Sequence, residues 1–248
     1  MSGPLLEARA VTRRFGGLTA VDGVDLALGE GEILGVIGPN GAGKTTLFSV
    51  MAGSMAPSEG EVLLEGRRMS GLPAHRVVHA GLVRTHQIVR PFAALTVAEN
   101  VAVAALHGAR RAGGTVHERV EEALAFVGLG ERAGDLPGAL TLSGRKRLEL
   151  ARALATAPRV LLLDEVIAGV NPAEALALAA LIRRIRDQRG VGIVLIEHVM
   201  PAVMSLSDRV AVLDHGKKIA EGRPEVVVRD PQVVEAYLGP GGAVGVAR

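Results

Sequence analysis

The sequence predicts an α/β fold in which helices cover the faces of a mainly parallel β-sheet. Apolar stretches of strand length occur at residues 33–37, 160–163 and 191–196, and a long helix is predicted over Pro172–Arg189. A glycine-rich loop connects the first of these strands to a second predicted helix at residues 44–52. Such alternation of strands and helices indicates a parallel sheet with helices packed against it.

The N-terminal part of the chain predicts antiparallel strands beside this sheet. Residues 5–11 form a strand-like run, and Gly16 and Gly17 mark a turn after it. Residues 24–28 alternate between apolar residues and smaller or acidic ones, and residues 61–65 read as a further strand bounded by glycines. We therefore expect an N-terminal antiparallel β-subdomain.

The middle of the chain, residues 91–155, predicts an inserted α-helical subdomain. Apolar residues recur at three- and four-residue spacing over residues 96–106 and 116–127. Gly128 follows the second of these stretches and is a suitable helix stop.

The last third returns to the α/β pattern, with a helix and then a strand predicted within residues 199–213. We expect one domain over residues 1–238, in which residues 1–90 and 156–238 form the α/β core together with the antiparallel sheet. Residues 239–248 are glycine-rich and are predicted to be disordered.

Composition and charge restrict the possible functions. The 28 Lys and Arg and 26 Asp and Glu give a formal net charge of +2, too balanced to indicate nucleic-acid binding. Cysteine is absent, which excludes disulfides and thiolate chemistry. Mean hydropathy is high at +0.31, yet no apolar stretch approaches the roughly 20 residues of a spanning helix. Because residues 1–15 also lack a signal-peptide pattern, we expect a cytosolic protein or one at the cytosolic face of a membrane.

The glycine-rich loop at residues 38–45 fits the pattern G-x-x-x-x-G-K-[ST]. Its glycines allow backbone N–H groups to converge on phosphate oxygens at the positive end of the following helix. Lys44 is expected to reach the β- and γ-phosphates, and the Thr45 hydroxyl to bind Mg²⁺. The alternative, a glycine-rich turn with an incidental lysine, is disfavoured by the position of the loop between a strand and a helix. The predicted nucleotide-binding residues here are Gly38, Pro39, Asn40, Gly41, Ala42, Gly43, Lys44, Thr45 and Thr46.

Two carboxylates end the apolar strand at residues 160–163. A buried strand is expected to end in such a pair only where a partner requires it. In a nucleotide-binding protein that partner is Mg²⁺, which Asp164 would hold. Glu165 is then free to polarise the attacking water. The alternative is an ordinary strand end that meets a polar loop.

Together these features, in their order and spacing, resemble the ABC ATPase family over nearly the whole chain. The resemblance implies a RecA-like P-loop NTPase core, with ATP and Mg²⁺ bound. It implies that Phe15 stacks on the adenine ring, and that Gln87 contacts both Mg²⁺ and a transmembrane partner. It also implies that residues 168–171 form the D-loop and that His198 joins Lys44 and Glu165 in catalysis.

Several stretches are more similar to the ATPase subunits of branched-chain amino acid importers, a group whose relatives import amides or urea. The stretches are residues 14–18, 83–87, 95–101, 168–172 and 235–239. This resemblance implies a homodimer, or a heterodimer with a paralogous ATPase subunit, docked on two integral membrane permease subunits at the cytoplasmic face of the cell membrane. A solute-binding protein outside the cell would take part indirectly, and no nucleic acid is expected.

The signature segment, usually L-S-G-G-Q in this family, is altered to Leu-Thr-Leu-Ser-Gly at residues 140–144. An ungapped register places Thr141 at the family's serine, whereas a one-residue deletion places Ser143 there and Gly144 at a glycine. We favour the ungapped register, because a deletion would rotate the following helix by about 100°. Ser143 also reads as an ordinary helix N-cap. Further departures are Val166 for a proline, Asn171 for an aspartate and His86 for an aromatic residue.

Two rival classes remain open from the sequence. One is a non-transport ABC ATPase of the DNA-repair or translation type, which usually carries long coiled coils or two ATPase units. The other is a P-loop kinase or GTPase, which would not need a D-loop, a signature or a switch histidine.

Overall fold

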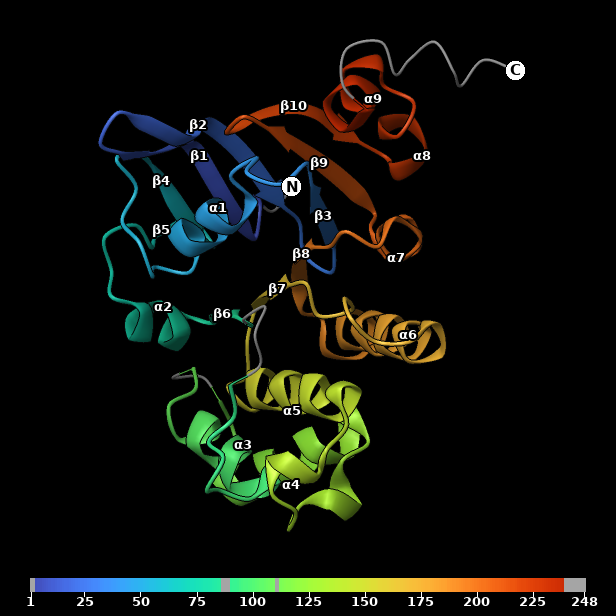
Figure 1. Cartoon of the computed structure of the whole chain (residues 1–248). Coiled ribbons are helices and arrows are strands. Elements are labelled where there is room, and N and C mark those ends of the chain that lie inside the picture. Colours follow the sequence, from blue (N-terminus) through green and yellow to red (C-terminus); the bar gives the residue numbers. More distant parts are fainter. Residues whose placement is uncertain (1–2, 86–89, 110–111, 239–248) are drawn as a thin grey trace.

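The computed structural model describes residues 3–85, 90–109 and 112–238, and its centre is a mainly parallel sheet (Figure 1). The strands of this sheet are β3 (Ile33–Ile37), β6 (Leu82–Arg84), β7 (Val160–Asp164), β8 (Gly192–Ile196), β9 (Arg209–Asp214) and β10 (Lys217–Gly222). Their spatial order is β10–β9–β3–β8–β7–β6, and only β10 pairs in the antiparallel sense. The predicted α/β class is confirmed.

Successive residues of the central strands enter two different apolar cores. In β7, Leu161 and Leu163 pack with residues of the long helix α6 (Pro172–Arg189). Val160 and Leu162 face the opposite core, which contains residues of α1 (Lys44–Met51). Because side chains alternate along a strand, a continuous apolar run is what a sheet buried on both faces requires.

An antiparallel sheet lies beyond α1 and completes the second core. Its spatial order is β2–β1–β4–β5, and its strands are β1 (Leu6–Phe15), β2 (Leu18–Leu28), β4 (Glu59–Leu64) and β5 (Arg67–Arg68). The turn at Gly16 and Gly17 joins the first two strands, as predicted. The expected N-terminal antiparallel sheet is therefore present.

The helices α3 (Val97–Leu106), α4 (Val116–Val127) and α5 (Leu142–Ala155) gather at one end of the molecule, away from β1, β2 and β10 (Figure 1). Capping boxes begin the first two, at Thr96 and Thr115. Gly128 ends α4 with a positive φ of 75°, at the predicted stop. The apolar face of this helical group is continuous with the core around α6, so the group packs directly on one face of the sheet.

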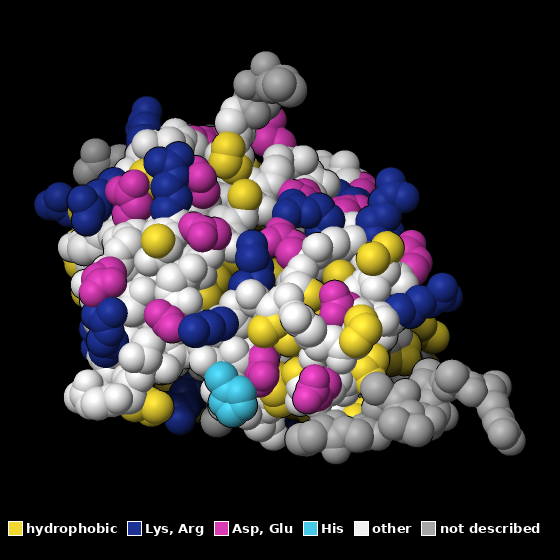
Figure 2. All heavy atoms as spheres, turned by 90° about the horizontal axis from the view of Figure 1, so that it is seen from above, with side chains coloured by type: hydrophobic (Ala, Val, Ile, Leu, Met, Phe, Trp, Pro, Cys, Tyr) yellow, Lys and Arg dark blue, Asp and Glu magenta, His cyan; other side chains and the backbone are white. Residues whose placement is uncertain are grey.

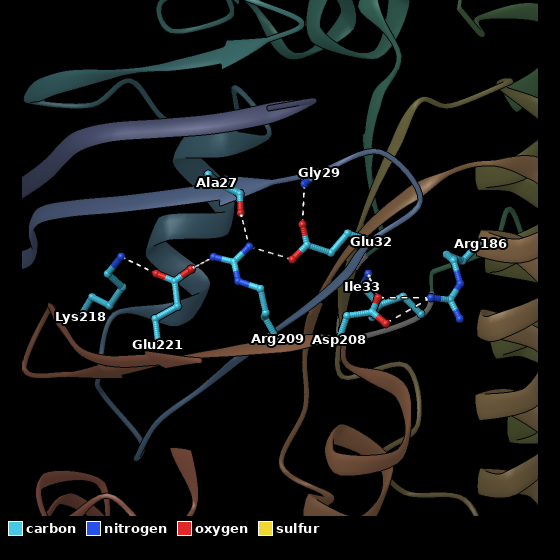
Figure 3. Close-up of polar contacts among 9 residues, drawn as sticks. All are labelled: Ala27, Gly29, Glu32, Ile33, Arg186, Asp208, Arg209, Lys218 and Glu221. Carbon is cyan, nitrogen blue, oxygen red and sulfur yellow. Dashed lines mark hydrogen bonds and ion pairs between the residues drawn. The ribbon is translucent and has the colours of Figure 1, made fainter. Parts of the chain in front are cut away.

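A network of charged side chains ties the central sheet to its neighbours (Figure 3). Arg209 on β9 donates to Glu32 Oε1 at 2.8 Å and to the Ala27 carbonyl at 3.3 Å, and it also pairs with Glu221 on β10. Asp208 accepts from the Ile33 amide at 2.8 Å. This network fixes the start of β3, the strand from which the phosphate loop departs.

Some elements were not predicted. They are α2 (Ala74–Ala80), α8 (Pro224–Val227), α9 (Pro231–Leu238), β5, β6 and β10, whereas α7 (Met200–Leu206) is the helix predicted at the start of residues 199–213. The sequence of β10 has only two apolar residues in six, Ile219 and Ala220, so it gives no alternating signal. The glycine-rich tail at residues 239–248, predicted to be disordered, lies outside the described residues.

On the face seen from above, basic and acidic side chains are interspersed and do not gather into a patch of one charge (Figure 2). Within the ranges that the structure describes, none of the helices has the length and apolar character needed to span a membrane.

Candidate nucleotide-binding site

The phosphate loop connects β3 to α1 and packs tightly on neighbouring strands. Gly38 and Gly43 have φ values of 149° and 99°. A Cβ at Gly38 would lie 2.0 Å from the Leu213 carbonyl oxygen, and one at Gly43 would lie 2.3 Å from the Ala20 carbonyl oxygen. Both positions therefore require glycine, for backbone conformation as well as for space.

Lys44 begins α1, and its ammonium group folds back over the loop. Nζ donates to the carbonyls of Gly38 at 2.7 Å and Pro39 at 2.8 Å. Burial lowers the pKa of Lys44, while the charges of Glu165 and Asp164 oppose that effect. The ammonium thus lies in a buried position beside the carboxylates, ready to exchange carbonyl partners for phosphate oxygens.

The N-terminus of α1 offers a favourable environment for an anion. Its first turn contains no acidic residue, so no side chain neutralises the positive end of the helix dipole. Thr45 is exposed and Thr46 is half-buried, while Asn40 and Gly41 leave the outer side of the loop open. The backbone amides and the Thr45 hydroxyl can therefore reach a bound phosphate and its cation.

Asp164, the last residue of β7, has a side chain only 2% exposed. Its Oδ2 accepts from Arg84 Nη2 at 2.7 Å, whereas Oδ1 has no hydrogen-bond partner within the described part of the chain. A buried carboxylate oxygen without a donor is unfavourable, and a cation would satisfy it. The Asp164 carboxylate and the exposed Thr45 hydroxyl of the phosphate loop both offer oxygen, the ligand that Mg²⁺ prefers.

In the part of the chain that the structure describes, protein carboxylates do not form a metal cage. Among the residues that the structure describes, no group of three or more His, Asp or Glu side chains could hold a metal ion. A Mg²⁺ ion would take its other ligands from a hydroxyl, water and phosphate oxygens, which is its usual mode of binding.

Glu165 follows Asp164 and contacts a different partner. Its backbone φ is 51°, in the left-handed region. Its Oε1 lies 2.7 Å from Nε2 of His198, and the side chains of Glu165 and His198 are 16% and 40% exposed. The structure thus brings these two predicted catalytic side chains into direct contact at the accessible ends of β7 and β8.

The start of α5 carries the altered signature, and Thr141 caps it. The Thr141 hydroxyl accepts from the Gly144 amide at 3.1 Å. Ser143 is buried within the first turn, so the alternative in which Ser143 is the N-cap is wrong. The helix begins one residue after Thr141, which leaves Thr141 as the exposed hydroxyl at the helix N-terminus. Within the described chain, no hydrogen bond joins residues 141–144 to the phosphate loop.

One further predicted residue, Phe15, lies at the end of a strand of the antiparallel sheet. Phe15 ends β1 with an exposed ring, and the Arg13 guanidinium lies 4.8 Å from the ring centroid. Gln87 and its neighbour His86 lie outside the described residues, so the prediction for Gln87 stays a prediction.

Sequence reasoning missed three charged residues at the site. Arg84 joins Asp164 to α1, since its Nη1 also donates to Ser49 Oγ at 2.9 Å. Lys146 and Glu197 are buried against the backbone next to Glu165. The available signal was a charged residue at a position that should be apolar: Lys146 shares the buried face of α5 with Leu150, four residues on.

A parallel sheet with a phosphate loop at one strand end, an unsatisfied aspartate at another and a Glu–His pair beside them defines a P-loop ATPase. A family model described as ABC transporter matches residues 21–168. A second model, described as branched-chain amino acid ATP-binding cassette transporter, matches residues 217–239.

Relatives match almost end to end. The high-affinity branched-chain amino acid transport ATP-binding proteins BraF of Pseudomonas aeruginosa and LivG of Escherichia coli K12 are 42% and 41% identical, over 96% of this chain and 99% of each relative. The lipopolysaccharide export ATP-binding protein LptB of Acidithiobacillus ferridurans is 34% identical over 95% of this chain and 97% of its own length.

Solved structures of ATP-binding cassettes have the same fold as this chain. The crystal structure of a nucleotide-free ATP-binding cassette from an ABC transporter superposes with a TM-score of 0.86 at 31% identity, covering 96% of this chain and 100% of that one. The ADP conformation of the cassette MJ1267 gives the same TM-score and identity, with 96% and 99% covered. The chain belongs to the ABC transporter family. It is an ATP-hydrolysing subunit of an ABC transporter and binds ATP and Mg²⁺.

Proposed function

We propose that this chain energises an importer of branched-chain amino acids, with amides or urea as the alternative cargo. Two relatives that it matches nearly end to end are named for high-affinity branched-chain amino acid transport. The observation that carries the proposal is the match at residues 217–239 to a family model of branched-chain amino acid cassettes. That segment lies outside the nucleotide-binding motifs, so it carries information on the kind of transporter that those motifs lack.

In this proposal the phosphates of ATP lie over residues 38–45. The amides at the start of α1 and the Lys44 ammonium would bind the β- and γ-phosphate oxygens, and Phe15 would stack on the adenine ring. Bound Mg²⁺ would neutralise phosphate charge. Thr45, Asp164 and Gln87 are the residues proposed to hold it.

Hydrolysis would depend on the pair at the ends of β7 and β8. Glu165 accepts a proton from the attacking water, which makes that water a better nucleophile. His198, already 2.7 Å from Glu165, holds the carboxylate in orientation and offers a donor to the γ-phosphate. Their different exposures support this division, because the Glu165 carboxylate is largely buried while the His198 imidazole remains accessible.

Each site would be completed by a second ATPase subunit, either a copy of this chain or a paralogue. In a head-to-tail dimer, the Thr141 hydroxyl and the free amides at the start of α5 would bind the γ-phosphate held by the partner. ATP binding would close the dimer and hydrolysis would open it. The exposed N-terminus of α5 supports this assignment, since nothing in its own described chain covers Thr141.

The movement would be transmitted to two integral membrane permease subunits near Gln87, at the cytoplasmic face of the cell membrane. An extracytoplasmic solute-binding protein would deliver the cargo to them. In this arrangement the ATPase subunit has no contact with the transported solute.

Solute uptake by cells that lack this gene tests the proposal. Uptake of labelled leucine and valine should fall by at least about tenfold, and the native gene should restore it. The Glu165→Gln variant should not, because Gln keeps the shape of the side chain but cannot accept the proton. Labelled urea and acetamide are measured in parallel. Normal leucine uptake with loss of urea uptake would contradict the branched-chain assignment, and full rescue by Glu165→Gln would contradict the role of Glu165.

A further inference from the structure

The three-residue segment after β7, Glu165–Val166–Ile167, contains an unfavourable backbone conformation. Glu165 has a φ of 51°. For a residue other than glycine, a left-handed conformation is unfavourable and persists only when the surrounding structure enforces it. In this conformation the Glu165 carboxylate meets His198, with Oε1 2.7 Å from Nε2.

Hydrogen bonds hold this segment on both sides of the unfavourable residue. The Glu165 amide donates to the Ile196 carbonyl at 2.9 Å. The Glu165 carbonyl accepts from Lys146 Nζ at 2.9 Å. Two residues on, the Ile167 amide donates to Glu197 Oε1 at 2.6 Å. Two of these three bonds come from charged side chains on different elements, α5 and the end of β8.

Both charged side chains are buried, Lys146 to 5% exposure and Glu197 to 1%. Lys and Glu are almost never buried to this degree unless they are paired. Burial lowers the pKa of Lys146 and raises the pKa of Glu197, although the opposite charges favour ionisation of each. Within the described residues no ion pair within 4.0 Å joins the two, and Glu197 Oε2 has no hydrogen-bond partner. Burial of these groups is therefore unfavourable, and their hydrogen bonds to the backbone are what they contribute.

We propose that Lys146 and Glu197 form a clamp that holds Glu165 in the left-handed conformation from which its carboxylate reaches His198. Both are positioning residues, since they act through the peptide groups beside Glu165 and not on the substrate. The inference rests on the catalytic role of Glu165 proposed above. Lys146 lies on α5, about one and a half turns after Thr141. The clamp therefore connects the helix that carries the signature to the catalytic carboxylate of the same subunit.

Two conservative substitutions at Glu197 distinguish the effect of its side-chain length from the effect of its negative charge. Glu197→Gln keeps an oxygen at the distance of the Ile167 amide but removes the charge, whereas Glu197→Asp keeps the charge and shortens the side chain. If the clamp acts as proposed, Glu197→Gln should keep kcat within about threefold of the native value. Glu197→Asp should lower kcat by about 100-fold with little change in KM. The reverse order, with Asp active and Gln inactive, would overturn the proposal.

Lys146 is tested with Lys146→Met and Lys146→Arg, with Arg147→Met as the matched control. Arg147 is on the same helix and also donates to a backbone carbonyl at 2.9 Å, but to that of Val127 on α4. Lys146→Met should lower kcat about 100-fold, Lys146→Arg should recover most of this loss, and Arg147→Met should stay within about threefold of native. Equal losses in Lys146→Met and Arg147→Met would overturn the clamp, because they would indicate a general effect on α5.

A double-mutant cycle with Glu165→Gln shows whether Lys146 acts through Glu165. If it does, Lys146→Met should add less than about twofold to the loss already caused by Glu165→Gln, in single-turnover hydrolysis. The double variant should also form the ATP-dependent dimer as Glu165→Gln does. Additive losses, or a lost dimer, would overturn the clamp. A native hydrolysis rate in Glu165→Gln alone would instead refute the proposed catalytic role itself.

Discussion

At the scale of single residues, the site depends on buried charged groups that bind other groups of the protein. Asp164 is the clearest case, since one of its oxygens is bound by Arg84 and the other has no donor among the described residues. The Arg84 guanidinium also bonds Ser49, whose hydroxyl donates to the Thr45 carbonyl at 2.7 Å. One guanidinium thereby connects the strand that leads to Gln87, the phosphate-loop helix and the predicted Mg²⁺ ligand.

Arg84→Met tests this connection. Removing one partner of a buried ion pair leaves the other charge unpaired, so the free energy of unfolding should fall by about 3 kcal/mol without nucleotide. Mg²⁺ with ATP should raise the melting temperature more in the variant than in the native chain, because the cation then relieves an unpaired Asp164.

Arg159→Met is the control for Arg84→Met. Arg159 pairs with Glu30 and Glu65 at 2.6 and 2.7 Å, but at the surface and away from the site. It should lose no more than about 1 kcal/mol and should show the native response to Mg²⁺ and ATP. If Arg84→Met and Arg159→Met respond equally to Mg²⁺ and ATP, Arg84 does not act through Asp164.

At the scale of helices and strands, local sequence signals decide how each element begins and ends. Thr96 and Thr115 are followed three residues later by glutamates that complete capping boxes, and α5 instead begins at Thr141 with a glycine at that position. The N-terminus of α5 therefore has one side-chain bond to a backbone amide, and its other amides remain available to a ligand.

Substitutions at Thr141 separate the structural role of this cap from its proposed role in binding. Thr141→Ala should lower the free energy of unfolding by about 1 kcal/mol, whereas Thr141→Asp should leave it nearly unchanged, because Asp is an equally good N-cap. Urea-induced unfolding of the isolated subunit measures both. Ser143→Ala should not weaken the cap, since Ser143 lies inside the helix; a larger loss for Ser143→Ala than for Thr141→Ala would contradict the observed cap.

The sequence predicted elements well where one strong local pattern decided them. Residues 33–37, Val116–Val127 and Pro172–Arg189 were predicted with the bounds that the structure has. Prediction failed where tertiary contacts decide the structure, as in β10, which is a strand because it pairs with β9 and not because of its composition. The same holds at the site: the phosphate loop is a local motif, whereas Arg84, Lys146 and Glu197 act on residues that are distant in the sequence.

At the scale of the whole molecule, the two halves of the proposed site lie on different parts of the subunit. The phosphate loop lies between the central sheet and α1, whereas Thr141 lies at the start of α5 in the helical group (Figure 1). In the described part of the chain no hydrogen bond joins them. A single subunit therefore presents two incomplete sites, which supports the proposed head-to-tail dimer.

Mixing two defective variants tests that arrangement. Lys44→Ala removes the cation of the phosphate loop but leaves the signature intact. Thr141→Asp keeps the helix cap but places a negative charge against the partner's γ-phosphate, while its own phosphate loop stays intact. In a mixed dimer both defects fall in one composite site, and the other site is built from two intact halves. The ATPase activity of the mixture of Lys44→Ala and Thr141→Asp should therefore exceed the sum of their separate activities and should be highest near equal amounts. A mixture of Lys44→Ala and Glu165→Gln should show no such gain in activity. The mixture of Lys44→Ala and Glu165→Gln is the control. Both substitutions lie on the phosphate-loop side, so each of the two sites in a mixed dimer carries one defect. Activity that never exceeds the sum at any ratio would contradict a site shared between subunits.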